Sequence, residues 1–259
     1  MTKKNNEAKA ILRITDVTHS FDGKIALDNV SFEVYEGEFL AILGPSGCGK
    51  TTILRNLIGL LFPDEGKIYL DDKDITCAAP SERDMGIVFQ NYALFENMTV
   101  LQNVQYAMKF RKDMKADSKK LALDMLERMG LSEHANKKPN MLSGGQQQRV
   151  AIARTLVLHP RVILFDEPMS ALDVETRLSL RKEIKQIQAE FGTTMIYITH
   201  DQEEAFAMAD RIMVMDNSKI VQLDTPINII KNPADAYVQR FVLDNLQTKI
   251  DSLAKYIDV

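Results

Sequence analysis

The chain has 259 residues, of which 45% are hydrophobic and 26% are charged, so it can bury a substantial core in one large domain or in a domain with a subdomain. Its formal net charge of -4 argues against a protein that binds nucleic acid by bulk electrostatic attraction, and we expect no nucleic-acid partner. The two cysteines, Cys48 and Cys77, are too few and too far apart for a disulfide framework or a thiolate metal site, which fits a reducing cytoplasm.

The first residues are polar and charged, without the apolar stretch of a signal peptide. No later window reaches the roughly 18 to 20 apolar residues of a membrane span. We therefore expect a chain that stays in the cytoplasm and does not cross a membrane by itself.

The N-terminal part predicts strands followed by a helix. Residues 11–17 and 29–43 alternate or run apolar with β-branched residues, which is typical of two or three strands. The last of these, "FLAIL", is apolar enough to be buried on both faces, as in a parallel sheet. From Lys50 the pattern "KTTILRNLIGL" becomes helical and ends near Pro63.

The middle of the chain changes character. Strands are predicted at 66–72 and 85–90, whereas Leu, Val and Met follow helical spacing over 100–129 and no further strand is expected before Val162. We predict a mostly helical insert over about 91–158.

The C-terminal part returns to alternating elements. The pattern predicts a strand at 162–167, a helix at about 174–190, a strand at 194–200, a short helix, and the strand pair "RIMVMD" and "KIVQL". Apolar strands that alternate with helices indicate an α/β protein with a parallel sheet. A helical tail is predicted over about 234–259, with apolar residues at helical spacing that either pack on their own domain or contribute to a dimer. These residues are Leu246, Ile250, Leu253 and Ile257.

A phosphate-binding loop lies between the buried strand and the first helix. The stretch "GPSGCGKTT" fits the pattern G-x-x-x-x-G-K-[ST], in which glycines let backbone N–H groups converge on a phosphate. Lys50 adds a positive charge for the β- and γ-phosphates, and the Thr51 hydroxyl is a ligand for Mg²⁺. The expected nucleotide-binding residues are Gly44, Pro45, Ser46, Gly47, Cys48, Gly49, Lys50, Thr51 and Thr52.

Two acidic residues end the strand "VILFDE". The carboxyl end of such a strand is where an open α/β sheet meets its ligand, and adjacent residues of a strand face opposite ways. We expect Asp166 to hold Mg²⁺ and Glu167 to orient and polarise the attacking water. His200 also ends an apolar strand, but a lone histidine there is more often packed or at the surface.

The stretch "LSGGQQQR" predicts a second anion site. Ser143 precedes a helix expected to begin near Gln146, while Gly144 and Gly145 leave room for an anion at the helix N-terminus. This site has no lysine of its own, and by itself the stretch also fits a simple helix cap.

Taken in order, "GPSGCGKTT", "FQ" ending at Gln90, "LSGGQQQR", "VILFDEP", "SALD" (170–173) and "TH" ending at His200 closely resemble the nucleotide-binding subunit of ATP-binding cassette (ABC) transporters. The resemblance spans about residues 11–240. It implies the α/β fold of P-loop ABC ATPases, with a mixed sheet core, an N-terminal antiparallel β part and a helical subdomain. It also implies one ATP-binding domain over 1–259, with ATP and Mg²⁺ as ligands and ATP hydrolysis as the activity.

The resemblance further implies a head-to-tail dimer. The signature loop of one subunit, here Ser143, Gly144, Gly145 and Gln146, closes over ATP held by the phosphate loop of the other, and Asp173 links the two sites. We expect a homodimer, although pairing with a second cassette subunit stays open.

The same resemblance assigns three further roles. Gln90 joins Thr51 and Asp166 around Mg²⁺ and couples the sheet to the helical insert, and His200 contacts the γ-phosphate. Phe21, in "HSFDG", stacks on adenine where many family members have tyrosine.

The stretch "NYALFENMTVLQNV" resembles importer cassettes of the polyamine, iron, sulfate and phosphonate groups, which are too alike here to indicate a solute. In importers this surface receives a coupling helix of the membrane permease. We place Tyr92, Leu94 and Phe95 in that groove, with packing inside the subdomain as the alternative. An importer also implies an extracytoplasmic solute-binding protein and a location at the cytoplasmic face of the cell membrane.

Many cassettes of these groups continue into a C-terminal regulatory β-domain, whereas this chain ends at Val259, so we expect that domain to be absent. Three other functions are less favoured. Soluble cassettes that act on ribosomes or DNA usually have two cassettes or long coiled coils, exporter cassettes are often fused to membrane spans, and a generic P-loop switch protein would have no use for "LSGGQ".

Overall fold

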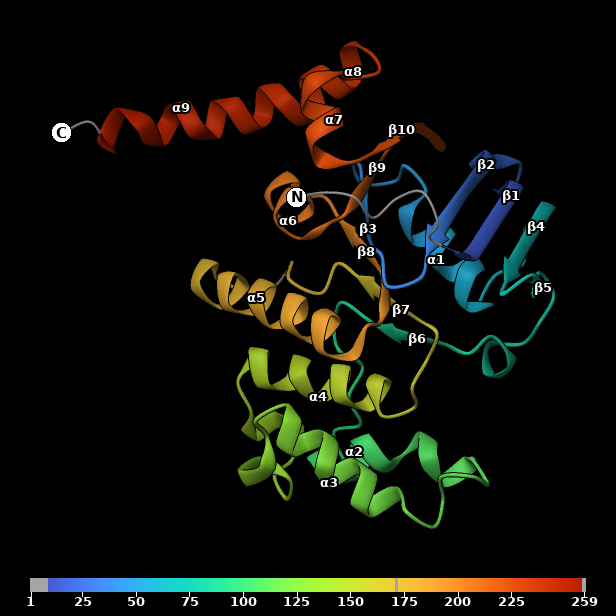
Figure 1. Cartoon of the computed structure of the whole chain (residues 1–259), viewed down its shortest axis with the longest axis vertical. Coiled ribbons are helices and arrows are strands. Elements are labelled where there is room, and N and C mark those ends of the chain that lie inside the picture. The colour runs from blue at the N-terminus through green and yellow to red at the C-terminus, as the bar shows by residue number, and fades with distance from the viewer. Residues whose placement is uncertain (1–8, 171, 258–259) are drawn as a thin grey trace. The chain divides into compact units, whose positions relative to one another are not determined.

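The computed structural model describes residues 9–170 and 172–257, apart from the side chains of 252–257. Ala171 of "SALD" and the side chains of Leu253 and Ile257 therefore lie outside the described residues. The chain divides into two compact units, the first formed by Met1–Arg83 with Gln188–Val259 and the second by Asp84–Ile187 (Figure 1).

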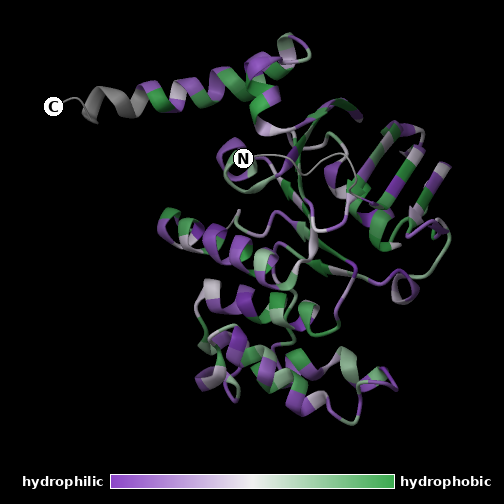
Figure 2. Ribbon diagram, viewed as in Figure 1, coloured by the Kyte–Doolittle hydropathy of each residue, from purple (hydrophilic) through white to green (hydrophobic). Residues whose placement is uncertain are grey.

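An antiparallel sheet in the first unit has the strand order β2-β1-β4-β5. Its strands are β1 (Ala10–Phe21), β2 (Lys24–Tyr35), β4 (Glu65–Leu70) and β5 (Lys73–Asp74). Figure 2 shows hydrophobic and hydrophilic residues alternating along β1 and β2, as expected for strands with one buried face.

The hairpin between β1 and β2 is longer than the sequence pattern predicts. Phe21 pairs with Lys24, and the two turn residues between them, Asp22 and Gly23, have φ angles of 49° and 78°. Two positive φ angles are typical of a type I′ turn, whose twist matches that of the flanking strands. The Asp-Gly turn thus extends the pairing to residues whose mixed polarity gives no strand signal in the sequence.

Four strands of the first unit lie in the order β10-β9-β3-β8. They are β3 (Phe39–Leu43), β8 (Thr194–Thr199), β9 (Arg211–Asp216) and β10 (Lys219–Asp224). β3 is parallel to both β8 and β9, and every residue of β3 and β8 is buried. The parallel pairing predicted from "FLAIL" is confirmed, and β10 adds an antiparallel edge.

Helices of the first unit include α1 (Lys50–Ile58), α6 (Gln202–Met208) and α7 (Pro226–Lys231). The predicted C-terminal helix consists of α8 (Ala236–Val238), a π-helical turn (Gln239–Asp244) and α9 (Asn245–Ile257). Val238 and Val242 are fully buried in one apolar cluster with Leu43 of β3 and Val214 of β9, and Leu246 packs against that cluster. The beginning of the tail therefore packs on its own unit.

The second unit combines two parallel strands with helices. These elements are β6 (Met85–Val88), α2 (Val100–Gln105), α3 (Ser118–Arg128), α4 (Gly144–Leu156) and β7 (Val162–Asp166). The three helices contact one another, and no residue between β6 and β7 is in a strand, as predicted. α5 (Val174–Phe191) begins in the second unit and ends in the first.

None of the helices within residues 9–170 and 172–257 combines the length and the apolar character needed to cross a membrane.

Candidate functional site

The phosphate-binding loop of the first unit joins β3 to α1. Gly49 caps α1 with a φ of 106° and no side-chain hydrogen bond, so the first N–H groups of the helix are not satisfied by a capping side chain. Lys50 is only 4% exposed, and its Nζ donates to the carbonyl oxygens of Gly44 and Pro45, each at 2.9 Å. A cation and a helix N-terminus thus lie within one short loop.

Two of the loop glycines, Gly44 and Gly49, are required by close backbone packing. A Cβ at Gly44 would lie 2.7 Å from the Met215 carbonyl oxygen, and a Cβ at Gly49 would lie 2.5 Å from that of Ala26. Contacts this short are not tolerated, so only glycine fits at both positions. The resulting cradle of backbone N–H groups, with Lys50 inside, suits the phosphate groups of a nucleotide.

The other loop residues differ in exposure. Ser46 and Gly47 are exposed, Pro45, Thr51 and Thr52 are half-buried, and Cys48 is buried. Burial raises the pKa of the Cys48 thiol, and the nearby charge of Lys50 opposes that rise. A raised pKa disfavours the reactive thiolate.

His200 and Phe21 also belong to the first unit. Leu43 pairs with Thr199 in the parallel ladder of β3 and β8, so the phosphate-binding loop and His200 begin at the same sheet edge. Phe21 ends β1, is 44% exposed, and lies edge-on to His19 at 4.6 Å between ring centroids. Its hairpin includes Ala26, whose carbonyl oxygen leaves no room for a Cβ at Gly49.

Gln90, Asp166 and Glu167 lie together in the second unit, because Val88 of β6 pairs with Phe165 of the parallel strand β7. The side-chain amide of Gln90 donates to the Ser170 hydroxyl at 2.8 Å, which donates to the Glu167 carbonyl oxygen at 3.0 Å. Ser170 was missed as a site residue, although it belongs to "SALD", because a bridging hydroxyl has no sequence signature of its own.

The signature residues form the start of α4. Ser143 accepts from the Gln146 N–H at 3.3 Å, and the Gln146 side chain accepts from the Ser143 N–H at 3.0 Å. The predicted cap at Ser143 is confirmed, and this reciprocal capping box starts the helix at Gly144, two residues before the predicted Gln146. A Cβ at Gly144 would lie 3.2 Å from Leu172, and one at Gly145 would lie 3.5 Å from Thr176.

Asp173 caps the neighbouring helix, α5. Its carboxylate accepts from the Thr176 N–H at 2.9 Å and from the Thr176 hydroxyl at 2.7 Å. These two hydrogen bonds, the backbone one first, hold the pKa of Asp173 below its usual range. Thr176 therefore lies beside Gly145 of the signature and is hydrogen-bonded to Asp173.

Tyr92, Leu94 and Phe95 do not share one environment. Tyr92 is only 8% exposed, so placing its ring in an open groove is wrong, whereas Leu94 and Phe95 are half-buried. The rings of Phe95 and Tyr106 are tilted with their centroids 4.4 Å apart, and Phe110 lies edge-on to Tyr106 at 5.4 Å between ring centroids. Phe110 is 74% exposed and was missed, because its chain neighbours are mainly charged.

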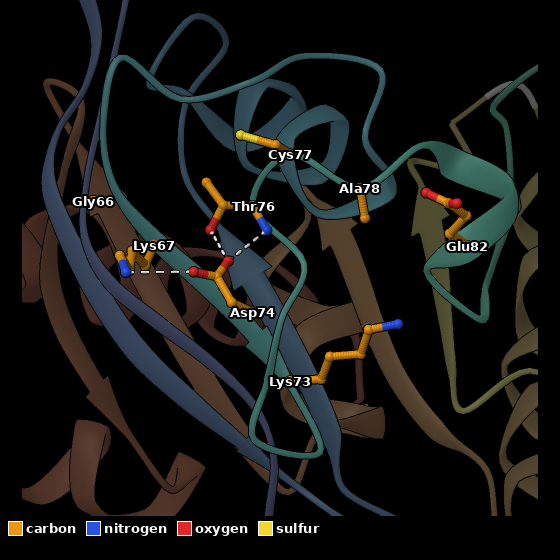
Figure 3. A pocket seen from close by; sticks show the side chains of 8 residues that line it. All are labelled: Gly66, Lys67, Lys73, Asp74, Thr76, Cys77, Ala78 and Glu82. Carbon is orange, nitrogen blue, oxygen red and sulfur yellow. Dashed lines mark hydrogen bonds and ion pairs between the residues drawn. The ribbon is translucent and has the colours of Figure 1, made fainter.

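A surface pocket of about 740 Å³ lies elsewhere in the first unit (Figure 3). The Asp74 carboxylate in it accepts from the Thr76 hydroxyl at 2.7 Å and pairs with Lys67 at 3.4 Å. The pocket shares no residue with the predicted ATP site. It is lined by Gly66, Lys67, Lys73, Asp74, Thr76, Cys77, Ala78 and Glu82.

Comparison with known proteins agrees with this geometry. The family profile described as ABC transporter matches residues 27–170. The chain is 46% identical over 234 residues to the spermidine/putrescine import ATP-binding protein PotA of Marinobacter nauticus, covering 90% of this chain and 63% of that protein. It is 46% identical over 237 residues to the PotA of Bacillus cereus, covering 92% of this chain and 72% of that protein.

A solved structure of cbiO1 from Clostridium perfringens, part of the ABC transporter complex cbiONQ, superimposes with a TM-score of 0.80 at 30% identity, over 95% of this chain and all of that one. The chain spans 63% to 65% of the length of the first three curated relatives. The predicted ABC-type P-loop fold is confirmed, and the chain belongs to the ABC transporter family.

Proposed function

We propose that the chain binds and hydrolyses ATP, pairs head to tail with a second cassette, and powers solute import through a separate membrane permease. The observation that carries this proposal is the presence of two glycine-led helix N-termini, those of α1 and α4, of which only the first has a lysine. In this proposal the N-terminus of α1, with its glycine loop and Lys50, holds the phosphates from one side, and the N-terminus of α4, which has no lysine, holds them from the other.

In this proposal the chain is one ATP-binding domain, with the helices of about 91–158 as its inserted subdomain. The loop of residues 44–52 holds the phosphates and Phe21 stacks on adenine. Glu167 orients the attacking water and His200 contacts the γ-phosphate. The buried position of Lys50 and the glycine cradle support the phosphate assignment.

Mg²⁺ is the proposed cofactor. Thr51, Asp166 and Gln90 are oxygen donors of the kind that Mg²⁺ prefers, and Gln90 and Asp166 follow paired parallel strands. The ion, when bound, neutralises charge on the β- and γ-phosphates. Gln90 is also connected through the Ser170 hydroxyl to the backbone carbonyl of Glu167. Gln90 therefore joins the proposed metal site to the backbone of the proposed base.

The second cassette is proposed to be another copy of this chain. Ser143, Gly144, Gly145 and Gln146 would contact the ATP held by the partner, and Asp173 would connect the two sites. The capping box leaves the Ser143 hydroxyl hydrogen available to a phosphate oxygen, since its oxygen acts there as an acceptor. Contact with Thr176 supports a link between the signature and Asp173.

The proposed permease surface consists of Leu94, Phe95 and Phe110. The aromatic rings of Phe95, Tyr106 and Phe110 contact one another in that order, and Phe110 at the end is exposed. Aromatic residues are enriched at protein interfaces. With a permease and an extracytoplasmic solute-binding protein, the chain would work at the cytoplasmic face of the cell membrane. The names of the PotA relatives make spermidine and putrescine the first solutes to test.

A trapping experiment tests the proposal. Tagged Glu167→Gln protein is incubated with ATP and Mg²⁺, membranes are solubilised gently, and the proteins that copurify are identified. We expect a protein with several membrane spans. Recovery of ribosomes or DNA-associated proteins, with no membrane subunit, would instead support a soluble cassette.

A further inference from the structure

A buried carboxylate of α6 is linked to the backbone beside His200. Glu204 is only 4% exposed, and its Oε2 accepts from the Thr199 hydroxyl at 2.8 Å and from the Tyr197 hydroxyl at 2.9 Å. Both donors belong to β8, the strand that ends immediately before His200. Thr199 and Tyr197 are themselves buried, so these hydrogen bonds are shielded from water.

The Thr199 hydroxyl is held from two sides. Its oxygen accepts from the Asp201 N–H at 3.0 Å while its hydrogen is donated to Glu204. The Asp201 carboxylate in turn accepts from the N–H groups of Glu203 at 2.8 Å and Glu204 at 3.4 Å. Thr199, Asp201 and Glu204 are thus joined in a closed circuit of hydrogen bonds whose members flank His200 in the chain, which we call the Thr199 network.

The Thr199 network fixes the backbone on both sides of His200, whose side chain is exposed. Residue 199 is held by its hydroxyl and residue 201 by its N–H and its carboxylate, so the peptide units of His200 have little freedom to rotate. A side chain on a fixed backbone loses less entropy when it reaches its contact with a ligand, and small misplacements of such a group cost rate.

We propose that Thr199 and Glu204 are positioning residues that orient His200 toward the γ-phosphate. This inference rests on the proposed function, because it requires that His200 takes part in hydrolysis. Neither residue touches the nucleotide in this proposal. Tyr197 donates to the same carboxylate but is not part of the Thr199 network.

Replacing Thr199 tests the proposal against a matched control. Thr199→Val and Tyr197→Phe each remove one hydroxyl that donates to Glu204 Oε2, at little change in shape. We expect Thr199→Val to lower the kcat of ATP hydrolysis about 10-fold with little change in KM. Thr199→Ser restores the hydroxyl and should restore kcat, while Tyr197→Phe should keep it.

A second pair of variants addresses Glu204. The amide oxygen of Glu204→Gln still accepts hydroxyl hydrogen bonds, so this variant should retain most of the kcat, whereas Glu204→Leu should lose it. Hydrogen exchange of the Asp201 amide provides a readout that does not depend on activity. It should quicken in Thr199→Val and stay unchanged in Tyr197→Phe, since the Thr199 hydroxyl oxygen accepts from that N–H.

A double-mutant cycle separates this inference from the proposed function. Thr199→Val should add no further loss in a His200→Ala background, because it acts through the histidine. If the two losses multiply, or if Thr199→Val and Tyr197→Phe lower kcat equally, the positioning role is overturned. If His200→Ala hydrolyses ATP at the normal rate, the proposed role of His200 fails instead.

Discussion

Glu167 has a strained backbone. Its φ of 45° lies in the left-handed region, which costs a residue with a side chain about 1–2 kcal/mol. The N–H and the hydroxyl of Ser170 both donate to the Glu167 carbonyl oxygen, at 3.3 Å and 3.0 Å, and hold this geometry. Extended backbone ends at Asp166, so the side-chain alternation of β7 does not extend to Glu167. Such strain at a strand end is typical of functional residues.

Replacing Glu167 by Gln removes the charge and keeps the shape. We expect ATP binding to persist while kcat falls by about 10²-fold or more, the scale of a lost general base. Measuring nucleotide affinity and steady-state hydrolysis on the same preparation checks both parts. Near-normal hydrolysis would remove Glu167 from this role.

Gln148 is a second residue that merits substitution. It is fully buried, and neither atom of its side-chain amide has a hydrogen-bond partner among the described residues. Since an unpaired buried polar group is costly, Gln148→Met should raise the free energy of unfolding by about 1 kcal/mol in urea titrations. The control is Gln147→Met, which loses hydrogen bonds to Pro139 and Leu142 and should destabilise. Equal destabilisation by both variants would contradict the prediction.

At the scale of elements, α1 is held at both ends. Its N-terminus is the phosphate-binding loop, and its C-terminal carbonyl groups accept from the guanidinium of Arg83, at 2.6 Å for Asn56 and 3.0 Å for Leu57. Arg83 also donates to the carbonyl oxygens of Thr76 and Ala78 and is fully buried. A cation at this end of a helix interacts favourably with the helix dipole.

Arg83→Met should therefore lower the free energy of unfolding by on the order of 3 kcal/mol, because several buried carbonyl groups lose their donor together. Arg83→Lys keeps the charge but cannot reproduce the planar donors, so an intermediate loss is expected. Urea unfolding of the three proteins gives the comparison. A loss below about 1 kcal/mol for Arg83→Met would mean that other donors replace the guanidinium.

The elements that the sequence predicts best are those with a strong local signal. "FLAIL" is apolar throughout and "GPSGCGKTT" has a fixed spacing, so β3, the loop and the beginning of α1 follow from local residues alone. The predicted end of this helix near Pro63 is wrong, because Gly59 with its left-handed backbone ends α1 at Ile58. The capping by Arg83 depends on contacts 27 residues apart and has no local pattern. Likewise, the burial of Tyr92 and the bridging role of Ser170 depend on how distant segments pack.

At the scale of the whole molecule, the proposed sites require two chains. Lys50 and the signature belong to different units of one chain, and the proposal pairs each with its complement on a partner. Ser143→Arg should then abolish hydrolysis while an isolated subunit still binds ATP, since the added bulk and charge meet the partner's nucleotide.

The matched control for this variant is Ser132→Arg, the same change at another exposed serine of the second unit. It should leave hydrolysis unchanged. Nucleotide affinity of the separated subunits and ATP turnover at high protein concentration are the two measurements. Loss of affinity in the isolated Ser143→Arg subunit would place the signature contact within one chain and contradict the dimer.

The unequal burial of the two cysteines allows the opening rate of the phosphate-binding loop to be measured by thiol labelling. Cys77 is exposed, so a thiol reagent should modify it at once, whereas Cys48 should react only when its surroundings open. The slow phase of labelling then reports how often the phosphate-binding loop opens around Cys48, without an engineered cysteine. A ligand that occupies the loop and favours its closed form should lengthen that phase in proportion to its concentration over its Kd.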